Sequence, residues 1–507
     1  RPDRGPTNRR RKGIGSDNTK VDTMVDLSKR DLLKLSGLAG GAVALGSGLG
    51  GCGLGSTANA ATGLSPEKNT LFANLPEYKL GSKPVVGDMM RITFLGTTPL
   101  ERLTQSCTSV FVELGNGESF VFDCGAGVTV NYTTMQIAYS KMRKIFLTHL
   151  HGDHTSDLTH IYCFGPQGDA KSPLYIWGPS ASGVPDPQGN TYDDGTLNFA
   201  YHFREMNRWH TESQSFVPTR YTDSEGDGYD LFATELNWKT GDTSRFWTTR
   251  PSIPKPPSGQ WVAYEANGVR ISYFPAIHGR AGSVSYKLEW KGLSMIFTGD
   301  TKPNRFLIEN ASNGPSAVDV LISEMVVPPQ FWATKLSGQS DPNNLEYQLA
   351  LKNAWAVQEN SHTPQKALGY ILNEIAKTGK APRLAVGTHF QAEDDTIVPA
   401  MADIRSWYSG PFTVASDFMV IDVTRDAVTP MRAVVSDYAW NPPPADPRSG
   451  YTDDPKYKDT RTVNPYAPMA PLAQFDPWLL AHVIPPCFYD PEDLSCVTPY
   501  PPPYKSQ

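Results

Sequence analysis

The chain has 507 residues, a formal net charge of −6, 39% hydrophobic residues and 19% charged residues. This composition is typical of a folded globular protein, and it excludes a mainly disordered or membrane-embedded chain. The negative balance provides no general attraction for nucleic acid, so we expect no nucleic-acid partner.

The first 60 residues have the pattern of an export signal. Lys29 and Arg30 precede an apolar, glycine-rich run over residues 37–51, and small residues at 58–60 suit a cleavage site. The basic pair is similar to a twin-arginine signal, with lysine in place of the first arginine, and Cys52 follows a sequence similar to a lipoprotein cleavage box. We therefore expect an exported protein, periplasmic or in the cell envelope, with Cys52 as a candidate lipid anchor and no transmembrane helix.

Residues 61–437 are predicted to form one folded domain, with a long, poorly periodic insert over about residues 180–259. Short runs rich in β-branched and aromatic residues predict the strands, and amphipathic spacing predicts the helices. The strands are expected at 91–97, 109–114, 119–122, 144–147, 269–274, 284–290, 295–298, 318–322 and 384–389, and two helices at 345–358 and 364–376. Because strands dominate both halves, the pattern predicts an α/β (α+β) fold with two sheets sandwiched between helices. Residues 438–507 are expected to form a proline-rich tail, in which Cys487 and Cys496 are a candidate disulfide pair.

Four potential metal ligands follow the strand at 144–147. His149, His151, Asp153 and His154 lie within six residues, and Gly152 allows the backbone to turn sharply between them. Imidazole and carboxylate together suit a borderline divalent cation such as zinc. A polar loop whose histidines only satisfy backbone groups would explain one histidine but not three, so the stretch predicts a metal site.

The motif Thr-His-x-His-x-Asp-His resembles that of the metallo-β-lactamase superfamily, whose fold is an αββα sandwich with metal ligands at strand ends. Three later strand ends carry the remaining residues of that pattern: His278, Asp300 and His389. The resemblance implies two Zn²⁺ ions per chain. It implies that His149, His151 and His278 hold the first ion, that Asp153, His154 and His389 hold the second, and that Asp300 bridges them. It also implies that Asp153 orients the attacking hydroxide.

Two further segments resemble the tRNA 3′-processing endonucleases and the arylsulfatase and phosphodiesterase enzymes of that superfamily. Glu324 ends a predicted strand and His362 precedes the helix at 364–376. The resemblance implies a proton relay in which Glu324 orients His362 and His362 protonates the leaving oxygen. The alternative is that His362 only caps the helix.

The expected function is hydrolysis of a small sulfate or phosphate ester by a dinuclear zinc enzyme. The tRNA enzymes usually carry a glycine shortly after the Asp-His pair, where this chain has Thr155, and the insert lacks a concentrated basic arm. We therefore expect a small-molecule ester as substrate, arylsulfatase-like or phosphodiesterase-like. The alternatives are a hydrolase of carbon esters, lactones or β-lactams, and a non-catalytic, metal-stabilised binding protein. The oligomeric state is left open, with a homodimer as one option.

Overall fold

The computed structural model describes residues 74–166, 168, 173–213, 229–250, 252 and 259–435. The predicted export signal, the candidate lipid anchor at Cys52, the proline-rich tail and the Cys487–Cys496 pair all lie outside these residues and stay predictions. Within the described residues, no helix combines the length and the apolar character needed to cross a bilayer.

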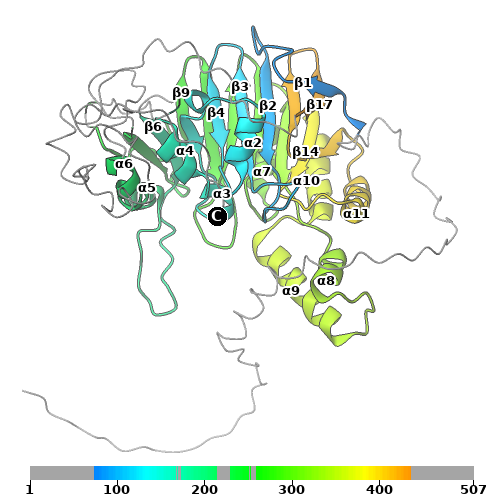
Figure 1. Cartoon of the computed structure of the whole chain (residues 1–507). Helices are drawn as coiled ribbons and strands as arrows, with labels where there is room; N and C mark the ends of the chain where they lie inside the picture. The colour runs from blue at the N-terminus through cyan, green and yellow to red at the C-terminus, as the bar shows by residue number, and fades with distance from the viewer. Residues whose placement is uncertain are drawn as a thin grey trace, which may run out of the picture. The chain divides into compact units, whose positions relative to one another are not determined.

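The larger of two sheets has ten strands, and its central strands carry the first part of the chain (Figure 1). Strands β4, β5, β6 and β7 run parallel to one another, so their carboxyl ends lie at the same edge. In spatial order the strands are β1 (Glu77–Lys79), β17 (Val428–Val434), β16 (Met419–Val423), β2 (Met90–Gly96), β3 (Ser109–Leu114), β4 (Ser119–Phe122), β5 (Lys144–Phe146), β6 (Leu174–Pro179), β7 (Leu231–Leu236) and β8 (Phe246–Thr248).

The second sheet has seven strands from the later part of the chain. Four of them, β12 to β15, are parallel, while β9 to β11 form an antiparallel meander that joins β12. In spatial order the strands are β15 (Phe412–Val414), β14 (Leu384–Thr388), β13 (Val320–Glu324), β12 (Leu293–Phe297), β11 (Val284–Trp290), β10 (Val269–Pro275) and β9 (Val262–Ala266).

An aromatic core fills the space between the sheets. Phe122 and Phe146 of the large sheet lie against Tyr286 of the small one, and the rings of Phe146 and Trp177 stack at 4.6 Å. These four side chains are no more than 2% exposed, so each adds the burial of a large apolar ring. The core therefore holds strand β5 in place, and β5 is the strand that precedes the histidine cluster in the sequence.

Helices cover the outer face of each sheet, which confirms the predicted αββα sandwich (Figure 1). Helices α2, α4 and α5 pack on the large sheet, and α7, α10 and α11 pack on the small one. The helices are α2 (Val128–Thr134), α3 (Gly152–Thr155), α4 (Leu158–Phe164), α5 (Thr196–Met206), α6 (Arg208–Ser213), α7 (Arg305–Ser312), α8 (Pro329–Ser337), α9 (Leu345–Ser361), α10 (Gln365–Lys377) and α11 (Asp394–Arg405).

The insert is more regular than its sequence predicts. It contributes helices α5 and α6, and strands β7 and β8 extend the large sheet. Strand β7 is buried at all six positions, so its sequence lacks the apolar and polar alternation that marks a half-exposed strand. This double-sided burial explains why periodicity does not reveal the strand.

Candidate metal centre

The carboxyl ends of parallel strands from both sheets bring the polar side chains together. In the large sheet, Asp123 follows β4 and His149 lies shortly after β5. In the small sheet, Asp300 follows β12, Glu324 ends β13 and His389 follows β14. Because β12, β13 and β14 pair in parallel register, their ends lie side by side. Ligand sites in α/β proteins commonly form at such strand ends.

Close backbone approaches require glycine on both sides of the centre. A Cβ on Gly299, whose φ is +56°, would lie 2.4 Å from the Cβ of Thr148. A Cβ on Gly125 would lie 2.0 Å from the carbonyl oxygen of Asp153. Any larger residue would push apart the two strand ends that carry the predicted ligands, so glycine sets the spacing of the centre.

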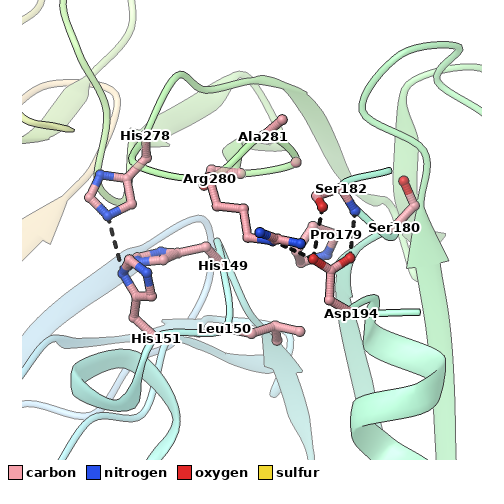
Figure 2. Close-up of a pocket in the computed structure, with 12 residues that line it drawn as sticks. His149, Leu150, His151, Pro179, Ser180, Ser182, Asp194, His278, Arg280 and Ala281 are labelled. Carbon is pink, nitrogen blue, oxygen red and sulfur yellow. Dashed lines mark hydrogen bonds and ion pairs between the residues drawn. The ribbon is translucent and has the colours of Figure 1, made fainter. Parts of the chain in front are cut away.

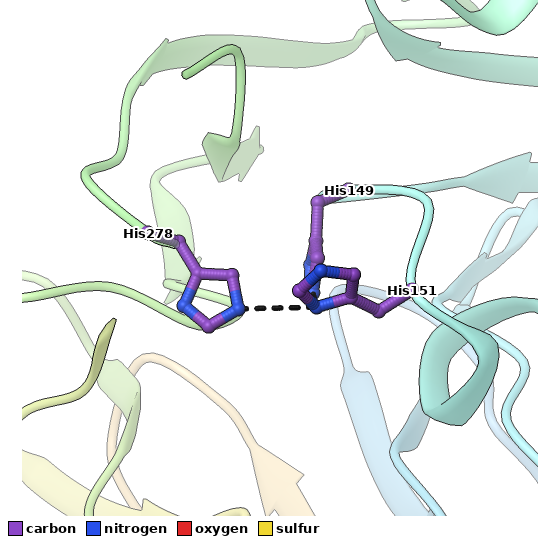
Figure 3. A group of neighbouring side chains, drawn as sticks. All are labelled: His149, His151 and His278. Carbon is purple, nitrogen blue, oxygen red and sulfur yellow. Dashed lines mark hydrogen bonds between the residues drawn. The ribbon is translucent and has the colours of Figure 1, made fainter. Parts of the chain in front are cut away.

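The first group of side chains consists of three histidines (Figure 3). His149 Nε2 lies 2.9 Å from His151 Nδ1, and His278 Nε2 lies 3.1 Å from the same atom. The three rings therefore converge on one point, although His278 comes from a different sheet. Burial lowers the pKa of each of these histidines, to about 4 for His278, which favours the neutral form that binds a metal.

The second group combines Asp153, His154, Asp300 and His389. Asp153 Oδ2 lies 3.3 Å from His154 Nε2 and 3.2 Å from His389 Nε2. Burial raises the pKa of Asp153, but the neighbouring imidazoles of His154 and His389 outweigh it and hold the pKa well below its usual range. The group therefore presents an ionised carboxylate between two imidazoles.

Asp300 is the one described carboxylate that faces both groups. Its Oδ1 lies 3.4 Å from the Nε2 atoms of both His154 and His389. Its Oδ2 lies 3.6 Å from His278 Nε2 and 3.9 Å from His149 Nε2. The side chain is 3% exposed, so its negative charge is held away from water at the point between the two groups. One oxygen toward each group is the geometry that a bridging ligand requires.

These distances fit zinc. Tetrahedral zinc with ligand bonds of about 2.0–2.1 Å places neighbouring ligand atoms about 3.3 Å apart. The shortest ligand-atom separations in and between the two groups, 2.9 to 3.9 Å, lie around that value. In addition, the buried His154 Nε2 and Asp300 Oδ1 have no hydrogen-bond partner among the described residues. Unpartnered polar atoms at the meeting point of a ligand set indicate that a cation completes the site.

A further carboxylate, that of Asp123, orients the His154 ring of the second group. Asp123 Oδ2 lies 2.7 Å from His154 Nδ1, and Asp123 also accepts hydrogen bonds from the backbone N–H and the hydroxyl of Thr148. Asp123 and His389 both have a left-handed φ, 57° and 56°, which is uncommon for residues other than glycine and often marks functional sites.

Replacing Asp123 with asparagine should lower zinc affinity by about ten- to a hundredfold, because it removes the carboxylate that fixes the orientation of the His154 ring. Competition with a chromophoric chelator measures the change. Asp422→Asn is the matched control: that carboxylate is also buried, but it pairs with Arg91 on another part of the sheet. Equal zinc affinity for wild type and Asp123→Asn would contradict the role given to Asp123.

Glu324 and His362 meet as the sequence predicts. His362 Nδ1 lies 2.9 Å from Glu324 Oε2, while Glu324 Oε1 accepts a hydrogen bond from the backbone N–H of Thr301. Burial lowers the pKa of His362, but the Glu324 carboxylate outweighs it and raises the pKa to about 9. The Glu324 carboxylate thus favours the protonated form of the imidazole, whose Nδ1 lies 3.9 Å from Asp300 Oδ2.

His362 opens onto a cleft of about 480 Å³ that also exposes the predicted ligands. His151, Asp153, His278, Asp300 and His389 line it. Two lining residues of the cleft are joined by a hydrogen bond that the sequence does not predict. His278 Nδ1–H donates to the carbonyl oxygen of Ser361, at 2.7 Å. No sequence motif signals that contact, because it depends on where helix α9 ends.

Comparisons with known proteins match the early part of the chain. The family model described as anti-Pycsar protein Apyc1 matches residues 90–177. A ribonuclease BN from Proteus mirabilis is 35% identical over 94 residues, which are 18% of this chain and 31% of that protein. A ribonuclease Z from Prochlorococcus marinus is 37% identical over 94 residues, 18% of this chain and 30% of that protein. The chain thus spans about a third of the length of the curated relatives it matches.

Solved structures with similar folds share little sequence identity. Human tRNase Z, short form, is 19% identical, with 65% of this chain and 98% of that chain covered and a TM-score of 0.39. The metallo-β-lactamase fold protein YhfI from Bacillus subtilis is 15% identical, with 66% and 100% covered and a TM-score of 0.39. The αββα sandwich and its metal-ligand groups confirm the predicted metallo-β-lactamase fold, and the relatives whose segments match are ribonucleases.

The predicted substrate class is wrong. The matched relatives are ribonucleases, which contradicts the expectation of a small sulfate or phosphate ester and the exclusion of nucleic acid. They argue equally against the carbon-ester alternative and the non-catalytic alternative. The physical error lies in using the net charge of the whole chain, because charges beyond about 8–10 Å are screened in salt and only those near the site act on the substrate.

Proposed function

We propose that this metallo-β-lactamase-fold hydrolase cleaves phosphodiester bonds in RNA with the help of two bound zinc ions. His149, His151 and His278 would hold one ion, and Asp153, His154 and His389 the other, with Asp300 shared between them. When bound, the ions lower the pKa of the attacking water and offset the negative charge of the phosphate oxygens. The observation that carries the proposal is the position of His362, beside Glu324 and within 3.9 Å of the carboxylate that joins the two groups.

The chain's own residues supply the proton transfers. Asp153 lines the cleft and accepts a hydrogen bond from the attacking water, so that the water oxygen points toward phosphorus. A new bond forms from that oxygen to phosphorus as the water loses a proton to solvent, and the bond from phosphorus to a ribose oxygen breaks. His362 gives its proton to the departing oxygen, and Glu324 stabilises the charged imidazole before the transfer.

The hollows around the centre leave room for a polymeric substrate. The cleft at His362 shares His151 and His278 with a second hollow of about 220 Å³. That hollow shares Leu150 and Asp194 with a third, of about 710 Å³, which lies along helix α5. The three hollows therefore lie next to one another beside the metal groups, and such a row offers room for several linked nucleotides as well as for one small ester.

The direct test is cleavage of end-labelled RNA by the full chain, first stripped with a chelator and then reloaded with zinc. We expect cleavage by the reloaded protein and none by the stripped one, with a DNA strand of the same sequence as the control. Bis(p-nitrophenyl) phosphate reports separately whether the centre is active on any phosphodiester. A zinc-loaded protein that hydrolyses this reporter but leaves single-stranded and folded RNA intact would overturn the proposal.

A further inference from the structure

The hollow of about 220 Å³ lies beside the first histidine group (Figure 2). The loop that carries His278 forms one wall, and the segment after β6 forms the other. His149, His151 and His278 reach into the rim, but His362 does not line it. A substrate group bound here therefore remains close to the metal groups and apart from the proton donor.

Arg280 spans this hollow from the His278 loop toward Asp194 (Figure 2). Its Nε donates to Asp194 Oδ2, and its Nη2 donates to the carbonyl oxygen of Val184 at 2.9 Å. Asp194 is held in turn by the backbone N–H and the hydroxyl of Ser182, both at 2.7 Å. Two elements distant in sequence thus fix the guanidinium in one orientation.

The Arg280 guanidinium keeps N–H groups that are available to donate hydrogen bonds to a ligand. Its side chain is 44% exposed, and its Nη1 forms no hydrogen bond with any described residue. Leu150, Pro179 and Ala281 supply apolar wall beside it. A planar arginine at the edge of an apolar hollow suits a nucleobase, because the base faces pack on apolar atoms while N–H groups bond its oxygen and nitrogen acceptors.

We propose that this hollow binds the nucleoside that stays attached to the phosphate after cleavage, and that Arg280 positions it. Because His362 protonates the leaving oxygen, the leaving half of the substrate lies in the His362 cleft, and the half that keeps the phosphate lies in the neighbouring hollow, which His362 does not line. This inference rests on the proposed RNA cleavage and adds a specificity-determining residue to it.

The test compares Arg280→Gln with wild type on a short RNA that has one cleavage site. We expect KM to rise about ten- to a hundredfold, the range for a lost hydrogen bond to a charged group, with kcat changed little. Hydrolysis of bis(p-nitrophenyl) phosphate, which has no nucleoside, should be unchanged, as should the zinc content. Arg270→Gln is the matched control. Arg270 is similarly exposed, lies on strand β10, which leads to His278, and pairs with Glu265 of strand β9.

A second substrate makes the test specific for position. Removing the base from the nucleoside that keeps the phosphate should raise the wild-type KM as much as Arg280→Gln does, and the variant should show no further rise. An unchanged KM for RNA in Arg280→Gln, or an equal loss on the nitrophenyl reporter, would overturn the inference while leaving RNA cleavage intact. Absence of RNA cleavage by the wild type would instead reject the proposed function, and this inference with it.

Discussion

Replacing Asp300 with alanine should lower kcat/KM for RNA by about a thousandfold or more, equivalent to about 4 kcal/mol of transition-state stabilisation. Asp300 contacts both ligand groups, with Oδ1 at 3.4 Å from His154 and His389 and Oδ2 at 3.6 Å from His278. Without the Asp300 carboxylate, two bound zinc ions would repel each other with less negative charge near them to offset the repulsion. We therefore expect the variant to retain less than two zinc ions per chain, measured by elemental analysis together with the kinetics.

Asp319→Asn is the control for Asp300→Ala. Asp319 is also buried, but it lies just before β13, at the opposite end of that strand from Glu324, where it binds Arg383. Its loss should reduce stability without changing zinc content or kcat/KM by more than a few fold. Two zinc ions and near wild-type activity in Asp300→Ala would remove the bridging role and, with it, the two-ion arrangement.

The histidine cluster is predictable from sequence because it is local. His149, His151, Asp153 and His154 lie within six residues directly after a buried strand, so their convergence needs only one turn. His278, Asp300 and His389 are weaker signals individually. They become predictable because each follows a strand end. The strands before Asp300 and His389 both pair in parallel with β13, and β10, which precedes His278, runs in the same direction as β12 because two antiparallel pairings separate them.

The contacts of Arg280 are not predictable in the same way. Its partner Asp194 lies 86 residues earlier in an irregular loop, and no periodicity or motif connects the two. The hydrogen bond from His278 to the backbone carbonyl of Ser361 is not predictable either. Every residue has a backbone carbonyl, so no residue type indicates this contact. Strand β7 escapes prediction for a different reason, since burial on both faces removes the alternation that identifies strands.

The substrate error shows where composition stops being informative. A net charge of −6 describes 507 residues, whereas a phosphodiester at the metal centre interacts with charges only a few ångströms away. Two zinc ions would add four positive charges at that point, beside the carboxylates of Asp123, Asp153, Asp300 and Glu324. The charge close to the site therefore differs from the net charge of the whole chain.

Replacing His362 with alanine should lower kcat for RNA by about a hundred- to ten-thousandfold, the usual contribution of a positioned general acid. The ribose oxygen is a poor leaving group and needs a proton as the bond to phosphorus breaks. The nitrophenolate of bis(p-nitrophenyl) phosphate leaves readily without one, so His362→Ala should retain most of its activity on that reporter. Zinc content should stay at the wild-type value, because His362 is not one of the seven proposed ligands, although it forms a third group of possible ligands with Asp300, Glu324 and His389.

Glu324→Gln separates the orienting role from the acid itself. The Glu324 carboxylate is what raises the pKa of His362, so its removal lowers that pKa and deprotonates the imidazole at a lower pH. Because the protonated form is the active acid, the fall of kcat for RNA at high pH should shift to lower pH in Glu324→Gln, while the reporter profile should not shift. Equal losses on both substrates in His362→Ala would instead mean that His362 maintains the metal groups, and the proton-transfer role would be lost.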